Sequence, residues 1–353
     1  MTSGKKQVVI VISCILFVLL YLIFAVLPAD HSLKIKPVWT VNVDKESGPE
    51  SSTSTPIPFK LGQRLGYFTT DGSILMTESF PYMATISSSK WATYTQSARN
   101  TPFYDCNETE LGSISLTGFP YFTNDGSFLF LPGGMAFSRI MDDGSEAWSY
   151  EYTSPITSFT DSAAGCTAGY ADGRLIYFDT EGNIVFSTKP GGSDYEVILG
   201  AAVSGTGEYT ACISGLDRQR FVLYRTQANQ TKTVFHEYLE GNLREQTFVK
   251  FSENRPRVFA NEKDGLLIVD TELLTSSHIP LKGKILDIKE LQNAGLFTVL
   301  TKNGTSFTIY IFEGEASLLG SFSFEASFAC INTDSDSLYV GRDTEITKLE
   351  ISK

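Results

Sequence analysis

The stretch Ile156–Lys189, ITSFTDSAAGCTAGYADGRLIYFDTEGNIVFSTK, predicts four short β-strands joined by tight turns. Its apolar and β-branched runs are only a few residues long, and small or polar residues separate them. Asp172-Gly173 and Glu181-Gly182 lie at two of the turns, where glycine supplies the positive φ values that tight hairpins need. The stretch therefore predicts one antiparallel sheet of four strands.

The same alternation of strand and turn recurs from Phe59 to the C-terminus. The middle turn of each unit falls at Phe80-Pro81, Pro132–Gly134, Asp172-Gly173, Leu216-Asp217, Asp264-Gly265, Asn303-Gly304 and Arg342-Asp343. Successive middle turns are roughly 40–50 residues apart, which is the period of a four-stranded propeller blade. We therefore expect an all-β fold, a seven-bladed β-propeller of four-stranded blades over residues 38–353.

The seventh unit has only three predicted strands, Ser327–Thr333, Leu338–Gly341 and Ile346–Ile351. A blade with an unpaired edge invites pairing with another chain. Val38–Val43 alternates apolar and polar residues and has no unit of its own, so we expect it to close the ring as the outermost strand of the last blade. Asp44–Pro58, polar and low in complexity, is expected to be an exposed loop.

The N-terminal part of the sequence carries the run Val8–Leu27, VVIVISCILFVLLYLIFAVL, which contains no charged residue. As a helix it would span ~30 Å, the thickness of a bilayer's hydrocarbon core. We expect one N-terminal transmembrane helix acting as an uncleaved signal anchor, with residues 1–7 as a cytoplasmic tail and residues 28–37 as a stalk. A cleaved signal peptide is the alternative. Either way, the domain is expected outside the cytoplasm, in the periplasm if the source is bacterial, and the anchor would make it a single-pass protein of the cell membrane.

The chain is acidic, with a formal net charge of −12 at pH 7. This charge argues against nucleic acid or an anionic lipid surface as the main partner of the soluble part. The five cysteines show no CxxC pair and no metal-ligand spacing. Cys166, Cys212 and Cys330 lie in apolar, strand-like contexts that favour buried thiols over disulfides, whereas Cys106 is in a polar segment and is expected to be exposed.

Four aromatic residues occupy matching places in the predicted outer strands: Trp39, Trp91, Trp148 and Phe186. Trp91, Trp148 and Phe186 each follow a turn residue by four positions. A bulky ring in the outer strand can pack against the next blade and fix the angle between blades. We therefore predict a structural docking role for these four side chains.

The segment Ile140–Tyr150, IMDDGSEAWSY, resembles the tryptophan-docking repeat of PQQ-like β-propellers, and Phe178–Ser187, FDTEGNIVFS, is similar with Phe in place of Trp. The later units depart from this pattern. The resemblance implies the propeller fold more than any activity. The group includes quinone-dependent dehydrogenases and non-catalytic scaffolds, one of them a propeller lipoprotein of the machinery that assembles outer-membrane β-barrels.

The sequence favours a non-catalytic protein, and we predict no catalytic, cofactor-binding or metal-ligating residues. No adjacent cysteine pair or GxSxG elbow occurs, and Gly205-Thr206-Gly207 lacks the third glycine of a dinucleotide-binding loop. Asp334 and Asp336 lack the further oxygen ligands of a calcium loop. The alternative is small-ligand binding or a quinone-dependent oxidoreductase activity in the propeller channel. Converging carboxylates or arginines there would favour this alternative, and a small apolar lining would exclude an enzyme.

A propeller without catalytic residues is typical of a binding platform, and the predicted function is a protein-binding scaffold or assembly factor with a protein partner in the cell envelope. Irregular insertions are the expected contact regions. One of them, Gln96–Glu110, carries Phe103 and Tyr104 in a polar setting. We predict that these two side chains contact a partner, with local packing as the alternative.

Overall fold

The computed structural model describes Phe17 and residues 33–45, 55–95, 99–228, 230–241, 243–292, 295–334 and 336–352. The chain divides into two compact units. The larger unit, Lys36–Glu350, holds the ring of sheets described below. The smaller unit comprises Met1–Ile35 and Ile351–Lys353, of which the structure describes mainly the ends of strands β1 (Lys34–Asn42) and β31 (Glu345–Ser352).

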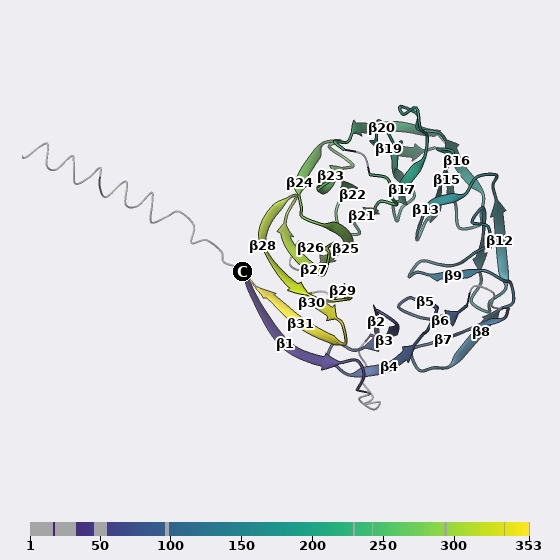
Figure 1. Cartoon of the computed structure of the whole chain (residues 1–353). Coiled ribbons are helices and arrows are strands. Elements are labelled where there is room, and N and C mark those ends of the chain that lie inside the picture. The colour runs from purple at the N-terminus through teal and green to yellow at the C-terminus, as the bar shows by residue number, and fades with distance from the viewer. Residues whose placement is uncertain are drawn as a thin grey trace, which may run out of the picture. The chain divides into compact units, whose positions relative to one another are not determined.

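The described residues of the larger unit form eight antiparallel sheets arranged as the blades of a propeller around a central channel (Figure 1). Blade 1 consists of β2 (Ile57–Leu61), β3 (Arg64–Phe68) and β4 (Ile74–Ser79). Blade 2 consists of β5 (Met83–Ile86), β6 (Trp91–Tyr94), β7 (Thr101–Tyr104) and β8 (Glu110–Ile114). Blade 3 consists of β9 (Phe119–Phe122), β10 (Ser127–Phe130), β11 (Ala136–Ile140) and β12 (Glu146–Glu151). Blade 4 consists of β13 (Ile156–Ser162), β14 (Gly165–Tyr170), β15 (Leu175–Phe178) and β16 (Ile184–Thr188).

The second half of the ring continues in the same way. Blade 5 consists of β17 (Ile198–Val203), β18 (Tyr209–Ser214), β19 (Arg220–Gln227) and β20 (Gln230–Tyr238). Blade 6 consists of β21 (Val249–Phe251), β22 (Arg257–Glu262), β23 (Gly265–Asp270) and β24 (Ser276–Pro280). Blade 7 consists of β25 (Lys284–Leu291), β26 (Leu296–Asn303), β27 (Ser306–Glu313) and β28 (Ser317–Glu325). Blade 8 consists of β29 (Ala329–Thr333), β30 (Ser337–Arg342), β31 and β1.

The expected seven-bladed ring of four-stranded blades is wrong, because the structure has eight blades. The sequence from Phe59 to Glu110 predicts one unit followed by an insertion, whereas in the structure these residues belong to the three-stranded blade 1 and the four-stranded blade 2. Phe80-Pro81, read as a turn inside a unit, lies in the loop between these two blades. The predicted insertion Gln96–Glu110 contains strand β7, which pairs with β8 over Thr101–Tyr104.

The N-terminal strand completes blade 8 from the opposite end of the chain. β1 lies beside β31, so the order in this sheet is β1-β31-β30-β29, and Figure 1 shows the purple β1 next to the yellow β31. The backbone N–H of Val43 donates to the Thr344 carbonyl at 2.8 Å, and the Thr40 and Thr347 hydroxyls lie 3.0 Å apart. The strand expected at Val38–Val43 is this β1, whose bounds differ by a few residues.

The expected transmembrane helix does not form part of the fold that the structure describes. Its predicted span, Val8–Leu27, lies outside the described residues except for Phe17. Within the described part of the chain, no helix is long and apolar enough to cross a membrane. Most of the predicted exposed loop, residues 46–54, also lies outside the described residues, and its last predicted residue, Pro58, belongs to β2.

Alternating strand directions give the propeller two distinct faces. In each four-stranded blade, the first and third turns lie on one face, which we call the turn face. The second turn and the loop to the next blade lie on the other, the loop face. Backbone hydrogen bonds show that second turns and interblade loops lie side by side. The Leu216 N–H of a second turn donates to the Tyr195 carbonyl of an interblade loop at 3.2 Å. Asp343 donates to Phe328 in the same way at 3.0 Å.

The hydrophobic core consists of clusters that lie between neighbouring blades. One cluster joins Phe137 of blade 3 to Phe178 of blade 4, with ring centroids 5.6 Å apart. Another joins Tyr339 of blade 8 to Phe68 of blade 1, at 5.2 Å. Burying each such ring contributes about 2–3 kcal/mol relative to leaving it exposed. The ring is therefore held together by side-chain packing between blades, whereas backbone hydrogen bonds hold each blade.

Candidate functional site

Two of the four predicted docking aromatics join neighbouring blades through the same geometry. Trp148 lies in β12, the outer strand of blade 3, and its indole N–H donates to the Thr180 carbonyl in the last turn of blade 4 at 3.1 Å. Its ring covers Gly182, where a Cβ would lie 2.5 Å from the indole. Trp39 of β1 donates to Thr70 at 3.3 Å and covers Gly72 in blade 1. Both glycines have positive φ, so turn and ring fit each other.

The other two aromatics are placed differently. Phe186 lies in β16, the outer strand of blade 4, and its ring centroid is 5.6 Å from that of Tyr224 in blade 5. Trp91 lies in β6, the second strand of blade 2, and not in the outer strand that the sequence suggested. It is buried, and its indole N–H donates to the Asp105 carbonyl of its own blade at 2.9 Å. The sequence places Trp91 in an outer strand because it does not reveal the boundary between blades 1 and 2.

The predicted partner contact at Phe103 and Tyr104 is corrected by their burial. Phe103 is 1% exposed and packs edge-on against Phe122 of blade 3, with ring centroids 5.7 Å apart. Tyr104 is half-buried against Trp91, at 5.0 Å. Both side chains belong to β7. Phe103 is part of the core between blades 2 and 3, whereas Tyr104 packs within blade 2 and keeps part of its surface exposed.

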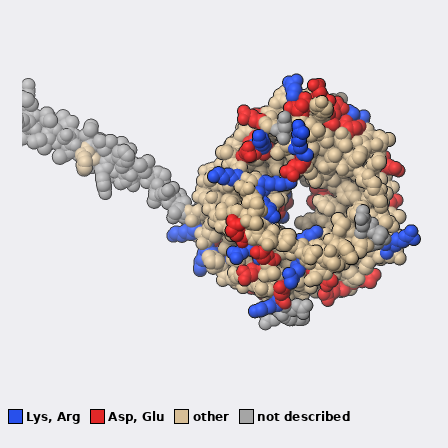
Figure 2. All heavy atoms as spheres, in the orientation of Figure 1, with Lys and Arg blue, Asp and Glu red and all other residues tan. Residues whose placement is uncertain are grey.

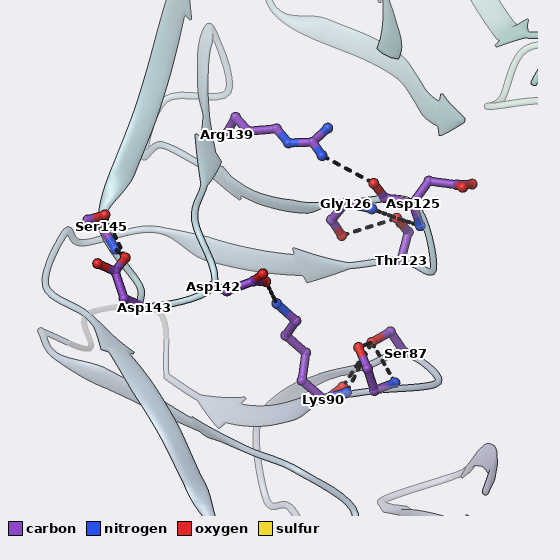
Figure 3. Close-up of polar contacts among 10 residues, drawn as sticks. Ser87, Lys90, Thr123, Asp125, Gly126, Arg139, Asp142, Asp143 and Ser145 are labelled. Carbon is purple, nitrogen blue, oxygen red and sulfur yellow. Dashed lines mark hydrogen bonds and ion pairs between the residues drawn. The ribbon is translucent and has the colours of Figure 1, made fainter. Parts of the chain in front are cut away.

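A lysine joins blade 2 to blade 3 (Figure 3). Lys90, in the β5–β6 turn, reaches across to Asp142 of blade 3 at 2.8 Å. Its ammonium also lies 5.6 Å and 5.8 Å from the ring centroids of Phe103 and Phe122. The paired Lys90 lowers the pKa of the Asp142 carboxyl. Asp142 is thus part of a junction between blades.

A cavity of about 1530 Å³ lies in the central channel (Figure 2). Its wall includes innermost strands β13, β17, β21 and β25 and the turns beside them. The lining is polar and charged as well as apolar, and its charged members are Asp125, Asp161, Glu208, Arg225, Lys250, Glu253, Arg255, Arg257, Glu272, Lys284 and Lys289. The channel therefore lacks the lining of small apolar residues that would exclude an enzyme.

An acidic region of this wall lies on blades 3 and 4. Burial raises the pKa of Asp161 to about 6, and the nearby Asp125 adds to this effect. The Thr123 hydroxyl donates to the Asp161 carboxyl, which opposes the increase by stabilising the charged form. Figure 3 shows the adjacent turn, where Arg139 donates to the Asp125 carbonyl at 3.1 Å. A carboxyl that titrates near neutrality in a cleft is a candidate ligand-binding or proton-accepting group.

A region rich in cations lies across the channel on blades 6 and 7, with Lys250, Arg255, Lys284 and Lys289 in the wall. Glu253 lies in the same wall, and Lys284 is paired with Glu245 at 2.6 Å. Burial lowers the pKa of Lys250, followed by repulsion from Lys289. Arg257 forms a buried ion pair with Glu290 at 2.9 Å, in which the side chains are 6% and 12% exposed. Loss of either partner would leave an uncompensated buried charge. This ion pair therefore links blades 6 and 7 beneath the more accessible cations of the wall.

Large apolar side chains are exposed on the loop face. They are Tyr82, Met83, Leu116, Met135, Tyr195 and Phe328. Their position on the loop face follows from the strand directions, because each residue lies in an interblade loop, at the start of an innermost strand, or in a second turn. On the turn face the corresponding side chains are Met141, Leu273 and Leu274, and the outer strands that begin at this face expose Leu111, Ile184 and Leu318. The three aromatic residues lie in different interblade loops of the loop face, and exposed aromatic residues are enriched at protein-binding surfaces.

In the described part of the chain, no group of three or more His, Cys, Asp and Glu side chains is arranged to hold a metal ion. Cys166 and Cys212 are buried free thiols, and Cys106 and Cys330 are half-buried free thiols. Cys106 is therefore less accessible than its polar sequence context suggests.

Sequence reasoning missed Asp161, Lys250 and the loop-face aromatics. Lys250 stands in the apolar-polar alternation of a short strand, TFVKF, which gives no sign of a channel. Phe328 falls inside the predicted strand Ser327–Thr333, so the sequence gives no sign that it lies in a loop between blades. Tyr82 follows the predicted turn Phe80-Pro81, but the sequence does not reveal the boundary between blades 1 and 2 at this point.

Comparisons with known proteins agree with the observed architecture. A family model described as a beta-propeller protein matches residues 1–353. An uncharacterized protein of Treponema pallidum (strain Nichols) is 29% identical over 347 residues, which cover 96% of this chain and 92% of that protein.

Three solved structures are similar in fold. BamB from Moraxella catarrhalis has a TM-score of 0.61 at 13% identity, over 90% of this chain and 100% of that chain. The computationally designed protein Ika8 has a TM-score of 0.59 at 12% identity, over 86% and 98%. A chain of a mitotic checkpoint complex has a TM-score of 0.54 at 8% identity, over 77% and 87%. At these identities the similarity shows the fold alone.

Proposed function

We propose that this chain, which belongs to the beta-propeller proteins, is a scaffold that binds another protein through its loop face. The observation that carries the proposal is the set of exposed apolar side chains on that face, Tyr82, Met83, Leu116, Met135, Tyr195 and Phe328. Exposed aromatic side chains lose water favourably when a partner covers them, and they cost little conformational entropy to order. The interblade packing supports the same role, because a rigid platform needs little reorganisation on binding.

The proposed partner is a component of the cell envelope, and the proposed location is outside the cytoplasm. The uncharged run Val8–Leu27 supports this location, because such a run directs a chain to a membrane for export. Protease would be added to cells whose cytoplasmic membrane is intact and whose outer membrane, if there is one, has been permeabilised. The protease should digest the propeller, and full protection of the propeller would contradict the location.

The blades are further proposed to be of the PQQ-like type. The support is the docking of Trp148 on the Thr180–Gly182 turn and of Trp39 on the Thr70–Gly72 turn. These contacts put the tryptophan of one blade on the glycine turn of the next, which is the role expected of the repeat.

Affinity capture from solubilised envelopes tests the protein-binding role. The full chain and a Tyr82→Ser/Phe328→Ser variant would be compared with a Met141→Ser/Leu273→Ser control on the turn face. The exposures match well, at 71% and 52% for the first pair and 53% and 70% for the control. We expect the loop-face variant to lose the captured protein and the control to retain it. Equal capture by both variants would contradict the proposal.

Small-ligand binding in the channel, including a quinone-dependent activity, is the second candidate function. It is favoured by the Asp161 carboxyl, whose pKa is raised to about 6 by burial in the cavity wall. Native mass spectrometry of the protein purified from its source would test this candidate. A bound small molecule that is lost in an Asp161→Asn variant supports it, and an unliganded mass counts against it.

A further inference from the structure

The basic wall of the channel stands out because the protein as a whole is strongly acidic. The chain has a formal net charge of −12, yet Lys250, Arg255, Lys284 and Lys289 line one side of the cavity. Blue side chains inside the channel are visible in Figure 2. A group of cations inside the channel of a strongly acidic protein needs a specific reason, because side chains in a channel contribute little to general solubility.

Lys250 is the most enclosed of these cations. Its ammonium donates to the Ile288 carbonyl of blade 7 at 3.0 Å. Among the residues that the structure describes, no carboxylate lies within ion-pair distance of Lys250, although Asp287, Glu253 and Glu290 lie near enough to favour its charge. An ammonium has three donors, and a carbonyl uses only one of them. The site therefore retains capacity for an anionic acceptor.

The neighbouring carboxylates are already engaged by other groups. Glu290 accepts from Arg257 at 2.9 Å, from the Ser252 hydroxyl at 2.7 Å and from the Glu253 N–H at 3.1 Å. Asp287 pairs with Lys289 at 3.3 Å and accepts from the Ile288 N–H at 2.8 Å. These bonds hold the carboxylates within the wall.

Arg255 is exposed at the turn-face end of this wall. In the described part of the chain, it forms no ion pair. Together with Lys250 and Lys289, it extends the basic surface along the channel from the β21–β22 turn to the middle of β25. A single small anion would cover one of these cations, whereas an extended ligand could meet all three.

We propose that the basic wall of the channel binds an acidic, extended peptide segment of a partner protein. The cavity volume of about 1530 Å³ exceeds the roughly 300–1,000 Å³ of ordinary small-molecule pockets, which favours a chain segment. Carboxylates of the segment would meet Lys250, Arg255 and Lys289, while Asp125 and Asp161 across the channel would repel them and so set the side on which they lie. The inference rests on the proposed function in taking a protein as the partner.

Fluorescence anisotropy with a short labelled peptide of alternating Glu and Ser tests this site directly. A Lys250→Gln/Lys289→Gln variant of the full chain should bind the peptide about tenfold more weakly, as expected when two partly desolvated charge contacts are lost. The charge-matched control Lys36→Gln/Lys232→Gln changes exposed lysines of the outer strands β1 and β20, and should bind within about twofold of the unmodified chain. Arg255→Gln, at an exposed turn, provides a variant that does not disturb a buried group and should weaken binding about threefold.

Equal weakening in the control, or no binding of the peptide at low salt, would overturn the proposal. A short oligodeoxynucleotide that binds the same wall more tightly than the peptide would also overturn it, in favour of nucleic acid as the occupant. The Tyr82→Ser/Phe328→Ser variant should bind the peptide normally. Failure of the channel site is therefore distinguishable from failure of the loop face to capture a protein.

Discussion

Trp148 and Trp39 show how single side chains set the angle between blades. Each indole donates to a carbonyl of the next blade and covers a glycine whose φ is positive, +85° at Gly182 and +96° at Gly72. The glycine serves two purposes, because it permits the turn and leaves space for the ring. The sequence predicts a docking role for both tryptophans and predicts the Glu181-Gly182 turn, because these features are local.

Substitution of Gly182 by alanine is expected to destabilise the protein by about 2–4 kcal/mol, because strain at positive φ adds to a clash with Trp148. Gly191→Ala is the matched control, since Gly191 has a φ of +68° and a Cβ there would meet nothing within 4 Å. The control should lose only about 1 kcal/mol. Urea unfolding measures both, and equal losses would show that ring contact at Gly182 is unimportant.

Asp161 makes the stability of the folded protein depend on pH. Burial raises the pKa of its carboxyl from 3.8 to about 6, so the folded state favours the protonated form. Stability from this group is therefore present at low pH and is lost as pH rises from ~4 through ~6. Asp161→Asn should remove the penalty and raise the free energy of unfolding by ~1–3 kcal/mol near pH 7.5, with little change near pH 4. Denaturant unfolding at both pH values, with Glu151→Gln as an exposed control, checks the sign. A stabilisation of the same size at both pH values would exclude titration as its cause.

At the scale of elements, blade 1 is the exception in the ring. Trp39 packs on the Thr69–Ser73 turn of blade 1, just as Trp148 packs on the last turn of blade 4. The Thr69–Ser73 turn is therefore the last turn of blade 1, and β2, β3 and β4 correspond to the second, third and outer strands of the other blades. In the described residues, no innermost strand precedes β2. The Asn332 side chain of β29 instead donates to the Pro58 carbonyl at 2.7 Å. Proline at this position also has no N–H to leave unpaired.

This exception explains what could and could not be predicted from the sequence. Regular turns such as Asp172-Gly173 revealed strands and hairpins, and the orphan strand Val38–Val43 was recognised because the last unit lacked a partner. The count of blades was wrong because a three-stranded blade does not fill the expected period, and because β7 lies in a polar segment. The site was less accessible to prediction, since Asp161 and Lys250 share a cavity only once the ring is closed.

Removing β1 should have a large effect on stability. Deletion through Asn42 would expose the edge of β31 and remove the Trp39 contact with blade 1, with an expected cost of more than ~3 kcal/mol and a tendency to associate. Deletion of Met1–Ala29 alone leaves β1 in place and should not lower the stability of the propeller. Thermal unfolding and light scattering of the two deletions would decide this, and an unchanged melting temperature without β1 would argue against closure by this strand.

At the scale of the whole molecule, the propeller presents three different surfaces. The loop face exposes aromatic side chains, the channel carries an acidic and a basic wall, and the described residues of the turn face expose aliphatic and methionine side chains. Packing between blades makes these surfaces parts of one rigid frame. A partner could therefore be held on the loop face while an acidic segment of it occupies the channel, without a change in the ring.

Site-specific photocrosslinking in the source cells can show whether a partner protein binds the loop face. A photoreactive amino acid at Tyr82 or Phe328 would be compared with one at Leu273, which is similarly exposed on the turn face. We predict a discrete crosslinked protein from both loop-face positions and none from Leu273. The same product from Leu273, or no product from either loop-face position, would contradict the proposed binding.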